Sequence, residues 1–83
     1  MFDNYPNPFN PSTVIAYELS TVSHVTLKIY DILGREVATL VNEKQNPGFY
    51  SVRFNAFYLS SGVYFYRIIA GRYNSVKKLV VMK

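Results

Sequence analysis

The side chains that could carry out acid–base or nucleophilic chemistry are few and far apart. The single histidine, His24, stands beside a predicted strand start with no carboxylate or serine motif near it. The five carboxylates fall at predicted turns or outward positions, and no spacing forces two of them together. Ser60-Ser61-Gly62 lacks the leading glycine and following helix of a nucleophile elbow. A lone histidine on which nothing converges is usually structural, so the sequence predicts a protein that is not an enzyme.

The sequence also lacks the motifs that bind common cofactors. It has no glycine-rich phosphate loop, no calcium loop of alternating acids, and no cysteine for a disulfide or a thiolate metal site. We therefore expect no cofactor and no metal. The remaining classes of function are binding, assembly and targeting.

The length of 83 residues allows one small domain, residues 1–83. A chain of this size buries about 60–65% of its unfolded surface. Its eight tyrosines and six phenylalanines must therefore supply much of the core. No apolar run approaches the ~18 residues of a membrane span, and no secretory signal peptide is visible. Because a strand-like segment follows Met1 directly, the chain is either a complete small protein or a domain cut from a longer chain, and we expect the second.

The net charge of +4 is distributed unevenly. All five acids lie in the first 43 residues, whereas the stretch from Lys44 to Lys83 has seven basic residues and no acidic one. Either an anionic partner contacts the C-terminal half, or the basic residues keep strand edges from pairing. Their spaced positions favour the second interpretation. Nucleic-acid binding is not expected, since no recognition helix or RNA-binding aromatic motif is present.

Alternation of apolar and polar residues predicts an all-β domain. The clearest strand is Val63–Ile69, which is apolar on both faces except at Arg67, as in a central strand. Three further segments alternate between apolar and polar residues: Thr13–Leu19, Val25–Tyr30 and Tyr50–Phe54. Glu36–Val41 is the expected hairpin partner of Val25–Tyr30, and a polar loop, Asn42–Gly48, follows it. In the last strand, Tyr73–Met82, the apolar end leaves the inward face ambiguous, and we favour Leu79 and Val81. A helix over residues 31–41 is the alternative to the hairpin partner, but its β-branched residues and short length argue against it.

A proline-rich ribbon is the seventh extended segment. The ribbon residues are Pro6, Asn7, Pro8, Phe9 and Pro11. Prolines at this spacing exclude a helix and a central strand, so we expect the ribbon to lie along a sheet edge. Seven short segments with regular turn signals predict a seven-stranded Ig-like antiparallel β-sandwich with a Pro-rich N-terminal edge ribbon.

The stretch from Leu59 to Tyr64 has the layout of a tyrosine corner. In such a corner a tyrosine hydroxyl bonds back to the turn that precedes its strand. Tyr64, Tyr66 and Ile68 would then face the core, and the alternate residues would lie on the outer face. Candidate residues for an outer contact surface are Phe57, Tyr58, Phe65 and Ile69.

Four stretches of the chain together resemble one known family. They are YPNPFNPS at 5–12, VTLKIYDILGREVATLV at 25–41, LSSGVYFYRI at 59–68 and KKLVVMK at 77–83. In this order and spacing they resemble the type A C-terminal sorting domain of the bacterial type IX (Por) secretion system. That domain is related to the Ig-like domain of flagellar hook-capping proteins. Phe57-Tyr58 departs from the family pattern, where small or polar residues are usual before Leu59.

The resemblance implies a non-catalytic targeting domain fused to the C-terminus of a cargo protein. The outer-membrane translocon recognises such domains once the cargo is in the periplasm. A sortase then removes many of them, and the cargo becomes attached to the cell surface or is released. The recognition residues implied by position are Gly62, Tyr64, Tyr66, Arg67, Lys77, Lys78, Val80 and Lys83.

Two other functions stay open at this point. A self-assembling Ig-like surface module, forming a fibre or layer, would use outward apolar residues and pairable edge strands. A carbohydrate-binding module would use surface tyrosines as stacking platforms. Family likeness, rather than site geometry, ranks targeting first.

Overall fold

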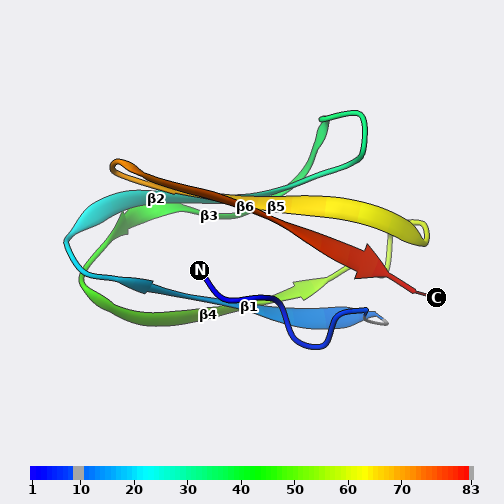
Figure 1. The fold of residues 1–83 in the computed structure, drawn as a ribbon, viewed down its shortest axis with the longest axis horizontal. Coiled ribbons are helices and arrows are strands. Elements are labelled where there is room, and N and C mark those ends of the chain that lie inside the picture. The colour runs from blue at the N-terminus through cyan, green and yellow to red at the C-terminus, as the bar shows by residue number, and fades with distance from the viewer. Residues whose placement is uncertain (9–10, 83) are drawn as a thin grey trace.

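The protein is a two-layer β structure (Figure 1). A computed structural model describes residues 1–8 and 11–82 and contains six strands and no helix in those ranges. The strands are β1 (Ser12–Leu19), β2 (Ser23–Tyr30), β3 (Glu36–Gln45), β4 (Gly48–Asn55), β5 (Gly62–Ala70) and β6 (Tyr73–Val81). One sheet pairs β1 with β4, and the other has the order β3-β2-β5-β6, all antiparallel. The all-β, sandwich-like prediction is confirmed.

The core lies between the two layers and follows the alternation in the sequence. The largest fully buried side chains are Tyr17, Tyr66, Ile15, Leu27, Ile29, Ile68, Leu79, Val25, Val81 and Thr13. Burial of each large aliphatic side chain stabilises the fold by about 1.5–3 kcal/mol. β5 is a central strand, with β2 and β6 paired to its two edges. The inward positions predicted for Tyr64, Tyr66, Ile68, Leu79 and Val81 are confirmed, since all five side chains are buried.

The turn between β2 and β3 closes through local polar contacts, as the hairpin interpretation requires. The Asp31 carboxylate accepts the N–H groups of Leu33 and Arg35 at 2.9 and 3.0 Å, and Arg35 Nε donates to its other oxygen at 2.8 Å. Gly34 adopts a φ of 81°, which glycine reaches without steric cost. The helical alternative for residues 31–41 is wrong.

The tyrosine corner is present at the start of β5. The Tyr64 hydroxyl donates to the Ser60 carbonyl oxygen at 2.9 Å. This bond fastens the turn before β5 to the strand itself, so the position of residues 60–64 is set by a buried ring.

The prediction of seven strands is wrong, because the Pro-rich segment does not form a strand of either sheet. The N-terminal segment pairs with β1 through one isolated bridge between Tyr5 and Val14, and Phe2 N–H donates to Ala16 at 3.0 Å. The pairing stops there because proline has no N–H with which to continue a ladder. Pro6, Asn7 and Pro8 lie in a bend instead. Pro11 directly precedes β1, and Phe9 lies outside the described residues.

β3 extends further than predicted. The sequence suggested a polar loop from Asn42, but Asn42–Gln45 continues the strand and pairs with the start of β2. Polar residues are tolerated because β3 is an edge strand with one side open to water. The Tyr17 hydroxyl also donates to Gln45 Oε1 at 2.6 Å, which ties the strand end to the other layer.

Candidate recognition surface

β5 and β6 bring together the two segments that the sequence marked for recognition. Their antiparallel register sets Gly62 opposite Val81, Phe65 opposite Lys78 and Arg67 opposite Val76. The first half of β5 and the second half of β6 are therefore direct neighbours. Residues 62–67 and 76–81 form one two-stranded surface, although about ten residues separate them in the sequence.

The outward face of these two strands mixes apolar and basic side chains, and we call it the outer β5–β6 face. Its residues are Val63, Phe65, Arg67, Ile69, Val76, Lys78 and Val80. Tyr30 of β2 is opposite Phe65 and extends the apolar part. A shallow hollow of about 360 Å³ lies here, with Tyr30, Ile32, Phe65, Arg67 and Val76 in its lining. The shape suits contact with a surface rather than enclosure of a small molecule.

The four residues expected to form an outer contact surface are divided between two places. Phe65 and Ile69 lie on the outer β5–β6 face. Phe57 and Tyr58 lie in the turn between β4 and β5, where they are 76% and 64% exposed. The Phe57 N–H donates to Asn55 Oδ1 at 2.9 Å, which fixes the turn.

The two tyrosines in the predicted recognition segment lie in the core. Tyr64 is 7% exposed and Tyr66 is fully buried. Burial raises the pKa of the Tyr66 hydroxyl, partly offset by the hydrogen bond from the Asn4 N–H. These rings support the surface from below and do not present a face to a partner.

The adjacent lysines of β6 have different surroundings. Lys77 Nζ lies 3.2 Å from the Asp3 carboxylate, on the side of β6 that faces the first residues of the chain. Lys78 is exposed on the outer β5–β6 face, opposite Phe65. Lys83 lies outside the described residues. Lys77 therefore forms an ion pair within the fold, whereas Lys78 is available at the surface.

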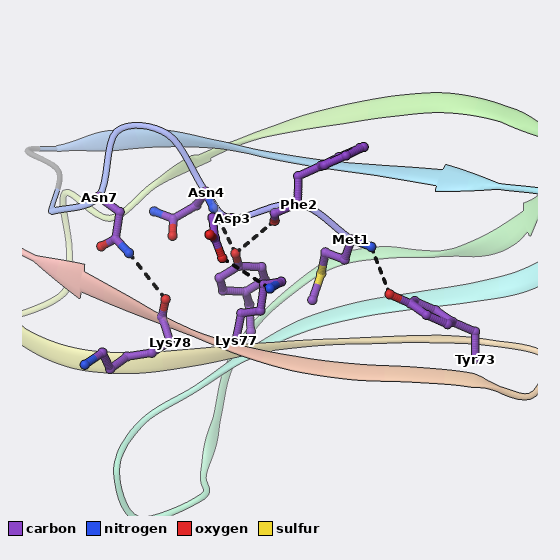
Figure 2. A network of polar contacts seen from close by, with 9 residues as sticks. Met1, Phe2, Asp3, Asn4, Asn7, Tyr73, Lys77 and Lys78 are labelled. Carbon is purple, nitrogen blue, oxygen red and sulfur yellow. Dashed lines mark hydrogen bonds and ion pairs between the residues drawn. The ribbon is translucent and has the colours of Figure 1, made fainter.

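Residues 1–8, which we call the N-terminal strap, cross from β1 to β6 (Figure 2). The buried Tyr66 hydroxyl accepts the Asn4 N–H at 2.9 Å and donates to the Phe2 carbonyl at 3.1 Å. Further along, Asn7 Oδ1 accepts the Val80 N–H at 3.0 Å, and Asn7 Nδ2 donates to the Lys78 carbonyl at 3.5 Å. The strap thus joins the two layers and contacts the outer edge of β6.

Several ionisable side chains of the described residues are held by local contacts. His24 Nε2 lies 2.8 Å from Asn42 Oδ1, and Glu36 is 3.0 Å from Lys28 Nζ. The hydrogen bond from Lys28 holds the pKa of Glu36 below its usual value, and the backbone N–H of Arg35 lowers the pKa of Asp31. Within residues 1–8 and 11–82, no three His, Cys, Asp or Glu side chains gather as a metal site. The same ranges contain no helix that could cross a membrane.

A family model described as a secretion system C-terminal sorting domain matches residues 3–82. The chain belongs to this sorting-domain family. It therefore carries a type IX secretion signal that directs export to the cell surface or the outside. The family consists of sorting signals rather than catalysts. No curated protein and no solved structure matched the chain.

Sequence reasoning missed how the strap of this sorting domain is held. Asn4 Nδ2 donates to the Pro6 carbonyl at 3.0 Å and to Thr13 Oγ1 at 2.9 Å, while the Thr13 hydroxyl donates to Pro6 at 2.8 Å. Asn4 and Thr13 are 3% and 1% exposed. Buried polar groups need partners, so this cluster fixes the exit of the strap from β1. No local sequence pattern predicts this cluster, because Tyr66, which binds the Asn4 N–H, lies about sixty residues away in the sequence.

The tip of the β2–β3 hairpin is a second exposed apolar site of the sorting domain that the sequence analysis did not select. The turn stands away from its layer (Figure 1) and carries Ile32 and Leu33, which are 71% and 73% exposed. It lies beside Ser60–Val63, with which it lines a hollow. The sequence signal that could have indicated this site is the pair of neighbouring apolar residues inside a predicted turn.

Proposed function

We propose that the type IX translocon in the outer membrane recognises this sorting domain through its outer β5–β6 face. The observation that carries the proposal is the register that places residues 62–67 beside residues 76–81. Both segments belong to the sorting-domain match. A receptor that contacts one segment on this face therefore meets the other.

The chemistry of the face favours an acidic receptor with an apolar centre. Lys28 is neutralised by Glu36, and Lys77 by Asp3. Arg67 Nε donates to the neutral Asn74 side chain at 3.0 Å, and the ion pairs of the described residues leave Arg67 and Lys78 without a carboxylate. Unneutralised cations steer an anionic partner, while burial of Phe65 and its neighbours supplies affinity.

The domain serves as the C-terminal part of a secreted cargo protein. The cargo passes through the periplasm, the translocon binds the domain, and the sortase cleaves it before the cargo is attached to the cell surface. The family assignment supports this sequence of events. The domain contributes recognition, and three of its carboxylates, Asp3, Asp31 and Glu36, are held in ion pairs within the fold.

The test fuses residues 1–83 to an inert reporter in a host that has a type IX system. The reporter should reach the surface or the medium, and it should stay inside when the host lacks the system. A reporter that remains in the periplasm of the competent host overturns the sorting role.

A charge reversal on the face tests the surface itself. Arg67→Glu should lower export, whereas Arg72→Glu, the same change in the β5–β6 turn, should not. Equal export of the two variants overturns the assignment of the outer β5–β6 face while leaving the sorting role intact.

A further inference from the structure

We propose that the outer edge of β6 accepts an extended acidic segment of a partner protein, and that Asn7 of the strap occupies this edge until the partner binds. The proposal deepens the recognition role given to β6 and rests on it. It concerns the main-chain edge of β6, whereas the preceding section concerns its outward side chains.

β6 pairs with β5 on one side only. The other side of an edge strand presents unpaired N–H and C=O groups to which another strand can bind. The Lys78 carbonyl and the Val80 N–H point to this outer side, because both meet the Asn7 side chain there.

Asn7 imitates a neighbouring strand with its side-chain amide. Its oxygen accepts the Val80 N–H at 3.0 Å, and its nitrogen donates toward the Lys78 carbonyl at 3.5 Å. A paired strand would offer the same acceptor and donor from its main chain. The longer contact lies at the limit of a hydrogen bond, so a main-chain partner with better geometry can replace Asn7.

The buried contacts of the strap end one residue before Asn7. Phe2 and Asn4 bind the Tyr66 hydroxyl, and the Pro6 carbonyl accepts hydrogen bonds from Asn4 and Thr13. Pro6, Asn7 and Pro8 are all exposed. Asn7 can therefore leave the edge while the first residues of the strap remain bound.

The charges beside the edge indicate the chemistry of the partner. Lys77 is paired with Asp3 of the strap, so the strap brings a carboxylate as well as an amide. Lys78 is a second cation on the opposite, outward face of β6, and no carboxylate pairs with it among the ion pairs of the described residues. A second copy of β6 would bring lysines against lysines, which is unfavourable across a strand pair. An extended segment with carboxylates satisfies both the main chain and Lys78.

The test uses the full chain and a synthetic ten-residue peptide in which Glu alternates with Thr, labelled for fluorescence anisotropy. Asn7→Ala should raise its affinity about tenfold, since loss of one competing hydrogen-bonding group raises the open fraction by that order. Hydrogen exchange at the Val80 N–H should accelerate by a similar factor. Asn46→Ala, in the β3–β4 turn, is the matched control and should change nothing.

Three outcomes overturn the proposal. One is equal peptide affinity for the native chain and Asn7→Ala. Another is equal binding of a peptide with Lys in place of Glu. The third is concentration-dependent dimerisation of Asn7→Ala, which would make a second copy the occupant. Reporter export is measured separately, so failure here is distinguishable from failure of the sorting role.

Discussion

The two edges of the four-stranded sheet are protected in different ways. The β3 edge is protected by its own sequence: the pairing with β2 skips Val37 and Leu40, and polar residues fill the strand end. The β6 edge is covered by the strap, whose Asn7 lies more than seventy residues earlier in the chain. Bulges and polar residues are permanent features, whereas a covering segment can be displaced. β6 is therefore the edge at which we propose that a partner can bind.

The largest expected effect comes from loosening the strap at its anchor. Tyr66→Phe removes the hydroxyl that binds Asn4 and Phe2. The buried Asn4 N–H loses its acceptor, so the free energy of unfolding should fall by about 1–3 kcal/mol, measured by chemical denaturation. Tyr30→Phe on the outer side of the sheet is the control and should change it by less than about 0.5 kcal/mol. Equal effects of the two changes would show that the strap adds no stability.

The next largest effect is expected from a substitution of Gly34, in the turn between β2 and β3. Gly34→Ala places a side chain at a φ of 81°, although no atom lies within 4 Å of the added carbon. Its cost is therefore conformational, about 1–2 kcal/mol in thermal or chemical unfolding. Gly34→Asn should cost less, because asparagine tolerates this region better. If alanine and asparagine are equally harmless, the turn does not set the β2–β3 hairpin.

A smaller effect separates the two lysines of β6. Lys77→Glu places a second carboxylate beside Asp3 and should lower stability by at most about 1 kcal/mol, because the Asp3 side chain is 85% exposed and water screens the pair. Lys78→Glu should leave the melting temperature almost unchanged. The melting curves of both variants at low and moderate salt provide the measurement. A larger loss for Lys78→Glu would contradict the different roles assigned to them.

The smallest expected effect is a loss of folding stability at low pH, caused by two carboxylates on the β3 side of the sheet. The folded-state pKa values of Asp31 and Glu36 lie below their ordinary values of 3.8 and 4.5. The unfolded chain therefore binds protons first, so their stabilisation is complete above those values and is lost as the pH falls through the lower folded ones. Asp31→Asn should flatten stability against pH in the acid range. An unchanged slope below pH ~4.5 would remove Asp31 from this account.

The sequence predicted the parts of the fold that local chemistry decides. Strand alternation set the inward residues, as at Ile15 and Leu79, and Gly34 marked the hairpin turn. The tyrosine corner followed from the spacing of Tyr64 and the turn before it.

Contacts between residues far apart in the chain could not be predicted from the sequence. Prolines 6 and 8 suggested an edge ribbon, but nothing local shows that Asn7 meets Val80 or that Asp3 meets Lys77. Polar Asn42–Gln45 looked like a loop because the supporting contact, Tyr17 with Gln45, comes from the other layer. The division of Phe57 and Tyr58 from Phe65 likewise depends on how the β4–β5 turn folds.

The most direct test of the central claim compares the export of two variants, one with a charge reversal on β6 and one with a charge reversal on β3. Lys78→Glu on β6 and Lys44→Glu on β3 make the same charge change at exposed positions. With the 1–83 reporter in a type IX host, Lys78→Glu should lower surface export about tenfold at an unchanged melting temperature, since charge reversal in an interface costs more than ~1.4 kcal/mol. Lys44→Glu should export normally. Equal export of the two variants would contradict recognition through β5 and β6.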